Sequence, residues 1–255
     1  MSALSGKVSI VTGSATDIGK AIAQRFAAAG ARVVIDYVGK DCVASASATE
    51  EAITRAGGEY LGVSADVSDP AQAQDLVARA VAKFGKLDIV VNNAGISPIY
   101  KPSIEVTQDE WDAIFAVNVS APFRVSQAAA RAMIAAGNGG AIIQMASVAG
   151  MIATPRMIAY GAAKAALLQI SRTLAVEWAN KGIRVNAIAP GYIATDLTAG
   201  IMSVPRYFDG IRAATPLGRF GEPDEIAGIA VYLASAASSF ATGQTFIVDG
   251  GISAQ

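Results

Sequence analysis

Short apolar runs of strand type alternate with longer helical stretches along almost the whole chain of 255 residues. Residues 7–12 (KVSIVT) are apolar and rich in β-branched side chains, whereas residues 18–29 have helical spacing and stop at Gly30. Strands that alternate with helices form βαβ units, which pair as a parallel sheet with helices on both faces. The sequence therefore predicts one α/β domain over residues 1–255, built on a doubly wound parallel sheet of about seven strands.

The individual elements are predicted from β-branched content, helical spacing and punctuation by Gly and Pro. Strands are predicted at residues 7–12, 32–37, 60–64, 87–91, 141–146, 183–189 and 245–248. Helices are predicted at residues 18–29, 42–56, 69–85, 108–136 with a break near Pro122, 160–179 and 223–234. Residues 192–220 lack clean periodicity and carry Pro205, Pro216 and several glycines, so we expect an irregular lid at about residues 192–215.

Composition excludes several classes of chemistry. The chain has 20 Lys and Arg against 21 Asp and Glu, a net charge of -1, which gives no basic surface for nucleic acid. It has no histidine, which removes His-dependent catalysis and imidazole metal sites, so we expect no metal. Cys42 is the single cysteine, so an intrachain disulfide is impossible. The chemistry must come from Tyr, Lys, Ser, Asn, carboxylates or a bound cofactor.

The high apolar content raises the question of a membrane. The mean hydropathy is +0.41, and residues 132–155 and 226–248 carry no charge. Both stretches are interrupted by Gly, Ser, Asn or Gln, whereas a spanning helix needs about 20 predominantly apolar residues. Residues 1–7 lack the apolar core of a signal peptide. We expect a soluble cytoplasmic protein without membrane contact, whose apolar excess lies in a core and in subunit contacts.

A glycine-containing loop, residues 12–19 (TGSATDIG), joins the first predicted strand to the first predicted helix. Gly13 permits a tight turn, and Gly19 lets the helix pack closely on the sheet. The N-terminus of the helix would then face bound phosphates with its partial positive charge. The loop predicts a dinucleotide site, although glycines in isolation often only make turns.

A second candidate site is the pair Tyr160 and Lys164, which are four residues apart on a predicted helix. Residues at this spacing share one helix face. A free tyrosine has a pKa of about 10, and a nearby cation favours the phenolate and lowers that pKa. The pair therefore suits proton transfer near neutral pH, although the same spacing also occurs on ordinary amphipathic surfaces.

These two features, with the NNAG segment at residues 92–95, resemble the short-chain dehydrogenase/reductase family in its classical form over essentially the whole chain. The resemblance implies a Rossmann-type fold and an NAD(P)-dependent oxidoreductase that interconverts a secondary alcohol and a ketone by hydride transfer. It implies cofactor contacts by Gly13, Thr16, Asp17, Ile18, Gly19, Asp36, Tyr37, Asp66, Val67, Asn93, Ala94, Gly95, Tyr160, Lys164, Pro190, Gly191, Ile193 and Thr195.

The resemblance also implies a catalytic tetrad. Ser147 ends the fifth predicted strand, 13 residues before Tyr160, and would hydrogen-bond the substrate oxygen. Tyr160 would move the proton, and Lys164 would tune Tyr160 and hold the nicotinamide ribose. Asn118 matches the residue that bends its helix in the family and holds a water that relays protons towards the lysine.

Asp17 departs from the family, whose TGxxxGxG loop has Gly at this position. One interpretation is that Asp17 caps the helix that starts at Ile18, since Asp is a good N-cap. The other is that its carboxylate repels the pyrophosphate. We favour the cap and expect some repulsion in addition.

The choice between NAD and NADP is nearly balanced. The position of the family's NAD-type Asp falls at Tyr37, and the acid lies one residue earlier, at Asp36, on the other face of the strand. The frequent NADP-type Arg is missing, although Lys40 could reach a 2′-phosphate. Asp17 and Asp36 favour NAD(H) slightly over NADP(H).

The substrate pocket is expected between residues 148–157 and 192–215, at the carboxyl ends of strands. Its predicted lining is Ser147, Met151, Ile152, Tyr160, Tyr192, Ile201, Met202 and Phe208. This mostly apolar set favours a small-to-medium, fairly apolar ketone or alcohol, with a sugar or polyol (glucose- or gluconate-type) dehydrogenase as the alternative. A non-enzymatic alternative is a silent dinucleotide sensor. Family enoyl reductases space Tyr and Lys wider than this chain does.

The C-terminal half also resembles the family's tetramer-forming region, so a homotetramer is expected.

Overall fold

The computed structural model describes residues 2–97 and 100–254. In this part of the chain the strands form one parallel sheet of seven, in the order β3-β2-β1-β4-β5-β6-β7. The strands are β1 (Val8–Val11), β2 (Arg32–Tyr37), β3 (Tyr60–Ser64), β4 (Ile89–Asn92), β5 (Gly140–Met145), β6 (Ile183–Pro190) and β7 (Thr245–Val248). The doubly wound parallel sheet predicted from the alternating pattern is confirmed.

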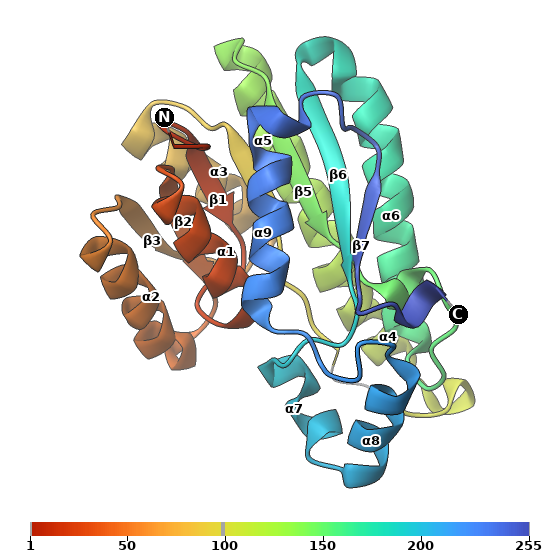
Figure 1. Cartoon of the computed structure of the whole chain (residues 1–255). Helices are drawn as coiled ribbons and strands as arrows, with labels where there is room; N and C mark the ends of the chain where they lie inside the picture. Colours follow the sequence, from red (N-terminus) through yellow and green to blue (C-terminus); the bar gives the residue numbers. More distant parts are fainter. Residues whose placement is uncertain (1, 98–99, 255) are drawn as a thin grey trace.

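Helices cover both faces of this sheet (Figure 1). They are α1 (Asp17–Ala28), α2 (Val43–Arg55), α3 (Pro70–Phe84), α4 (Gln108–Phe115), α5 (Ala121–Ala136), α6 (Ile158–Trp178), α7 (Asp196–Met202), α8 (Pro205–Ala214) and α9 (Pro223–Ala234). Helices α1, α2 and α9 pack on one face, and α3, α5 and α6 pack on the other.

Successive strand residues supply the two cores alternately, because side chains in a strand point to opposite faces. In β1, Val8 and Ile10 join the cluster with α3, α5 and α6, whereas Val11 joins the cluster with α1 and α9. All three are fully buried. Because the sheet is covered on both sides, its strands need continuous apolar runs, and much of the apolar excess of the chain lies here.

The strand order reverses beside β1, since the chain winds outward to β3 and then returns to β4 on the other side. At such a switch point the loops that follow the two neighbouring strands diverge and leave a crevice at their carboxyl ends. Helices α7 and α8 lie at this end of the sheet (Figure 1). The fold therefore places a binding site beside the loops after β1 and β4.

The helical break predicted near Pro122 is present: it lies at Ala116–Ser120, a π-helical segment η3 between α4 and α5, and Pro122 sits in the first turn of α5. One segment differs from the prediction. Residues 192–215 are not irregular, because they contain α7 and α8. Both are short, so their periodicity is weak in the sequence. Thr195 and Pro205 start them with a capping box and an N-terminal proline, signals that find such helices.

Over residues 2–97 and 100–254, no helix combines the length and apolar character that crossing a membrane requires.

Candidate active site

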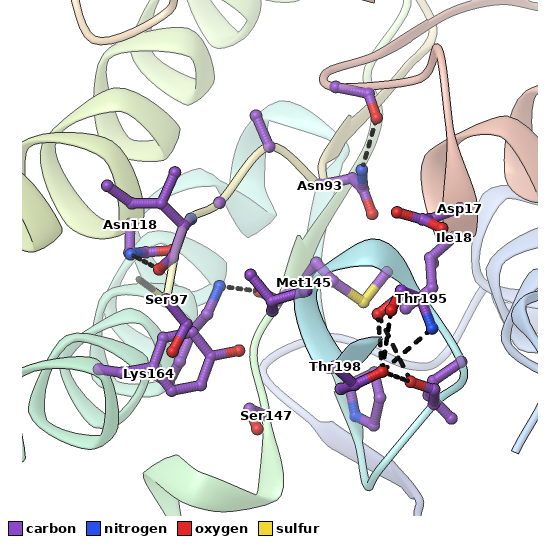
Figure 2. A pocket seen from close by; sticks show the side chains of 18 of the residues that line it. Asp17, Ile18, Asn93, Ser97, Asn118, Met145, Ser147, Lys164, Thr195 and Thr198 are labelled. Atoms are coloured by element: carbon purple, nitrogen blue, oxygen red, sulfur yellow. Dashed lines mark hydrogen bonds between the residues drawn. The ribbon is translucent and has the colours of Figure 1, made fainter. Parts of the chain in front are cut away.

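A cleft with a volume of about 990 Å³ runs along the carboxyl ends of the strands. It extends from the glycine loop after β1 past the end of β5 to α7 and α8. Every residue predicted to contact the cofactor lines it except Gly19, and all four predicted catalytic residues line it as well. Side chains from segments far apart in the sequence, such as Asp17, Asn118 and Lys164, thus line one space (Figure 2).

The glycine loop is packed so closely that two of its glycines have no room for a side chain. Gly13 has a φ of +59°, and a Cβ there would lie 3.0 Å from the Cα of Ala94. Gly19 does not line the cleft but packs behind the loop, where a Cβ would overlap the Gly13 carbonyl oxygen and lie 2.6 Å from Asn93 Nδ2. The close packing predicted for Gly19 is therefore present.

Asn93 and Thr12 fasten this loop to the end of β4. The Asn93 side chain donates from Nδ2 to the carbonyl oxygens of Thr12 (3.0 Å) and Gly13 (3.1 Å). In return, Thr12 Oγ1 accepts from the backbone N–H groups of Asn93 and Ala94. The two loops of the switch point are thereby held as one unit, which leaves the loop backbone facing the cleft.

The capping role predicted for Asp17 is wrong. Helix α1 begins at Asp17 itself, after an N-cap at Thr16, and Asp17 has a φ of +53°, in the left-handed region that suits glycine. Its carboxylate therefore turns away from the α1 backbone and accepts the backbone N–H of Asp196, the first residue of α7, at 3.3 Å. Burial and the nearby Asp196 carboxylate raise the pKa of Asp17.

Asp36 is held against the glycine loop. The side chain is 2% exposed, and its Oδ2 accepts the backbone N–H of Gly13 at 3.1 Å. Its Oδ1 is buried without a hydrogen-bond partner among the described residues. Burial therefore raises its pKa to about 7, which the neighbouring Asp66 carboxylate reinforces. Tyr37, the next residue, points to the opposite side of the strand and is half-buried.

Asn118 sits inside the π-helical segment η3 and is fully buried. Its side chain donates from Nδ2 to the Ile96 carbonyl (2.8 Å) and the Ile114 carbonyl (3.1 Å). Pro122, four residues later, has no N–H to offer the Asn118 carbonyl, which accounts for the departure from α-helical bonding. Asn118 is thus anchored to the loop after β4, beside Gly95, where a Cβ would lie 2.7 Å from Asn118 Oδ1.

Lys164 is buried at the centre of the site. Only 3% of the residue is exposed, and its Nζ donates to the carbonyl of Met145 at the end of β5 at 2.8 Å (Figure 2). The ammonium also lies 5.5 Å from the centroid of the Tyr160 ring, so the two side chains do share a helix face. Burial lowers the pKa of Lys164 to about 8.

The pKa of the Tyr160 phenol differs from the prediction. The sequence predicts that Lys164 lowers this pKa. In the structure, burial raises the pKa of Tyr160 to about 12, against the lowering effect of a hydrogen bond with Ser147. The physical reason is that the Lys164 ammonium is directed at the Met145 carbonyl and not at the phenol oxygen. Ser147 Oγ also accepts the backbone N–H of Ala149, which fixes the serine beside the phenol. In this arrangement Tyr160 holds its proton.

The substrate end of the cleft is partly as predicted. Ile152, Tyr192 and Ile201 line it. Met151, Met202 and Phe208 do not: Met151 is 45% exposed, Met202 Sδ accepts from Thr198, and Phe208 stacks on Phe220. Hydroxyl-bearing residues outside the predicted set also line the cleft, among them Ser97, Tyr100, Thr154 and Tyr207. The position of Ser97, Tyr100 and Thr154 after β4 and β5 was the available signal.

The shape and chemistry of the cleft fit a dinucleotide. The glycine loop presents backbone close to the cleft, and acidic side chains follow β2 and β3 at one end. At the other end lie a phenol, a serine hydroxyl and a buried ammonium. No group of three His, Cys, Asp or Glu side chains that could hold a metal ion occurs in the part of the chain that is described. The arrangement can bind a nucleotide and move a proton beside it.

Comparison with known proteins agrees with this chemistry. A family model described as Enoyl-(Acyl carrier protein) reductase matches residues 13–253. The 2-dehydro-3-deoxy-D-gluconate 5-dehydrogenase of Dickeya dadantii is 42% identical over 97% of this chain and 96% of its own length.

Solved structures of dehydrogenases share this fold. A short-chain type dehydrogenase/reductase from Mycobacterium marinum is 37% identical with a TM-score of 0.94, covering 99% of this chain and 97% of that one. A gluconate 5-dehydrogenase from Burkholderia cenocepacia J2315, solved in complex with NADP and tartrate, is 36% identical with a TM-score of 0.92 and covers 99% and 97%.

The geometry of Asp17 generates a prediction about cofactor affinity. Because its carboxylate lies in the cleft, Asp17→Asn should remove repulsion of phosphate, and Asp17→Gly should in addition relieve the left-handed backbone. We expect both variants to bind the cofactor about 3- to 10-fold more tightly, since a screened surface charge acts with about 1 kcal/mol. Calorimetric titration with NAD and NADP measures this. Unchanged or weaker binding by Asp17→Asn would contradict the repulsion.

Proposed function

Because the chain belongs to the short-chain dehydrogenase/reductase family, we propose that Tyr160, Lys164, Ser147 and Asn118 interconvert a secondary alcohol and a ketone in the cleft. The protein is an NAD(P)-dependent oxidoreductase. A nicotinamide cofactor held by the residues at the glycine-loop end of the cleft would supply the hydride donor or acceptor for this reaction. The single observation that carries the proposal is that a phenol, a serine hydroxyl and a buried ammonium lie together in the cleft that the glycine loop also lines.

The direction of proton transfer depends on whether the substrate is reduced or oxidised. In reduction, the Tyr160 hydroxyl gives its proton to the substrate oxygen as the carbonyl carbon gains the hydride. In oxidation, the substrate hydroxyl returns that proton to the phenolate. Ser147 is hydrogen-bonded to Tyr160, so it would orient the same substrate oxygen and stabilise its developing negative charge. A phenol that holds its proton at neutral pH is ready to act as the acid in reduction.

Lys164 and Asn118 support this proton transfer without exchanging a proton with the substrate themselves. The ammonium, 5.5 Å from the phenol ring, stabilises the phenolate that forms when the proton leaves. Asn118 fixes η3 to the loop after β4, and a water at its carbonyl would pass protons towards Lys164. The proposal for Asn118 is supported by its full burial and its three hydrogen bonds to backbone groups of Ile96 and Ile114.

For the cofactor we propose a slight preference for NAD(H) over NADP(H). The support is electrostatic, since Asp17, Asp36 and Asp66 all line the cleft and disfavour an added phosphate. The Burkholderia relative binds NADP, so both cofactors belong in the assay.

For the substrate we propose a small-to-medium ketone or secondary alcohol with an apolar body, supported by Ile152, Ile201 and Leu197 on the cleft. A sugar or polyol is the second candidate. It is favoured by the hydroxyls of Ser97, Thr154 and Tyr207 on the same cleft and by the gluconate-type relatives. A panel of alcohols, ketones and sugars, followed at 340 nm with each cofactor, decides between them. Tight cofactor binding without any turnover would support the silent sensor instead.

We also propose one functional unit in which α7 and α8 form the lid, assembled as a homotetramer in the cytoplasm, where NAD(P) is supplied. Apolar side chains that are well exposed on a single chain support the assembly. Phe240 is fully exposed, and Tyr232 on α9 and Ile247 on β7 are 39% and 44% exposed. Light scattering coupled to size exclusion should give four times the 25.9 kDa chain mass, and a monomeric mass would refute the proposal.

Removal of one oxygen atom tests the proton donor. Tyr160→Phe should lower kcat by about 10²- to 10⁴-fold, the usual contribution of a general acid, while the cofactor dissociation constant stays within about 3-fold. Initial rates at 340 nm and cofactor fluorescence measure the two effects. The matched control is Tyr60→Phe on β3, outside the cleft, which should retain full activity. Full turnover by Tyr160→Phe would overturn the assigned role.

The pKa values predict a pH profile. Because burial lowers the pKa of Lys164 to about 8, the ammonium is charged below that pH and becomes neutral above it. Tyr160, with a pKa raised to about 12, stays protonated throughout. The rate of ketone reduction should therefore be level at low pH and fall as pH rises through about 8, because the phenolate loses its supporting charge. A reduction rate that stays level to pH 10 would contradict this assignment.

A further inference from the structure

Arg156 lies at the rim of the cleft, in the loop that leads from β5 to α6. Its neighbours Thr154, Pro155 and Met157 line the cleft, and α6 begins two residues later at Ile158. The Arg156 guanidinium stands 5.2 Å from the centroid of the Tyr100 ring, and Tyr100 also lines the cleft. The cation is therefore placed at the substrate end of the site on an aromatic surface.

The backbone holds Arg156 in an unusual conformation. Its φ of +70° is in the left-handed region that arginine rarely adopts. The backbone N–H of Lys101 donates to the Arg156 carbonyl at 3.1 Å, which ties the two loops together. A strained conformation persists only where the surroundings determine it, and such positions cluster at functional sites. The side chain thus starts from a fixed point at the mouth.

Tyr100 also contacts helix α8. Its ring meets the ring of Tyr207 on α8 edge to face, with centroids 5.7 Å apart. Tyr207 also lines the cleft. Three segments therefore meet at this part of the rim, namely Tyr100 after β4, the loop before α6 and helix α8.

The charge distribution leaves the Arg156 guanidinium available to bind an anion. Among the described residues no carboxylate pairs with Arg156, whereas neighbouring Lys101 is paired with Glu110 at 2.6 Å. The described acidic residues that line the cleft are Asp17, Asp36 and Asp66, all at the cofactor end. The substrate end thus combines an unpaired guanidinium with a lining that carries no carboxylate among the residues described there.

We propose that Arg156, held on Tyr100, is an anion-binding subsite that recognises a carboxylate on the substrate, away from the reacting carbonyl. This inference rests on the proposed function and narrows its substrate class to anionic carbonyl compounds and hydroxy acids. A planar guanidinium binds a carboxylate through two parallel N–H···O bonds, and the aromatic ring keeps it oriented for this. Because the carboxylate is remote from the chemistry, Arg156 acts on substrate affinity and not on the rate of hydride transfer.

The test uses substrate pairs in which a neutral ester or hydroxymethyl group replaces the carboxylate. The full-length protein is assayed with 4-oxopentanoate, 5-oxohexanoate and 6-oxoheptanoate against their methyl esters, and with D-gluconate against D-glucitol in the oxidative direction. The acid should exceed its neutral partner in kcat/KM for at least one chain length. Arg156→Gly, which suits the positive φ, should lower that kcat/KM by about 10- to 100-fold through KM, as expected for loss of a charged hydrogen bond. The neutral partner should change by less than about 2-fold, and Arg156→Lys should retain part of the preference.

The outcomes separate the two proposals. Arg79→Gln on α3 removes a distant charge and should leave every ratio unchanged. Equal losses for acid and neutral partner in Arg156→Gly, or no acid preference in the wild type, would overturn the subsite while leaving the oxidoreductase intact. Absence of turnover with every pair and with the wider alcohol, ketone and sugar panel would overturn the proposed function, and the subsite with it.

Discussion

The buried ammonium of Lys164 is the interaction on which the rest of the site depends. A charged group taken out of water is costly unless it is hydrogen-bonded, and the side-chain bond the structure gives it is to the Met145 carbonyl. That bond fixes α6 against the end of β5 and so sets where Tyr160 stands, one helical turn earlier. Because a carbonyl is neutral, it holds the ammonium without cancelling its charge. The protonated phenol gains nothing from that charge at rest, and we propose that only the phenolate formed during proton transfer does.

The surrounding fold brings segments that are far apart in the sequence to this point. The reversal of strand order beside β1 opens the crevice, and Thr12 and Asn93 tie its two walls together. The π-helical segment then carries Asn118 to Gly95, where even a methyl group would collide with it. Precise placement thus comes from backbone contacts and missing side chains, which explains how a chain without histidine can build a proton-transfer site.

The sequence predicted most of the sheet and less of the local geometry. Strand β2 and helix α9 have the predicted bounds, because β-branched runs and a Pro-initiated helix are strong local signals. The left-handed backbone at Asp17, by contrast, depends on a family position that glycine usually fills, and its contact with Asp196 joins residues 179 positions apart. The direction of the Tyr160 pKa was also missed, since burial and the competing Met145 carbonyl are tertiary effects. The part of Tyr207 could not be read from the sequence, because its contact with Tyr100 joins residues 107 positions apart and forms only in the folded chain.

The most direct test of the account is the ionisation of Lys164 itself. Protein labelled with ¹⁵N at lysine Nζ can be titrated by NMR, with Lys164→Met identifying the resonance. The account predicts a signal that loses its proton near pH 8, well below the value of about 10.4 for a free lysine side chain. A Lys164 resonance that titrates at about the free-lysine value would show that the ammonium is not buried at this junction and would contradict the account.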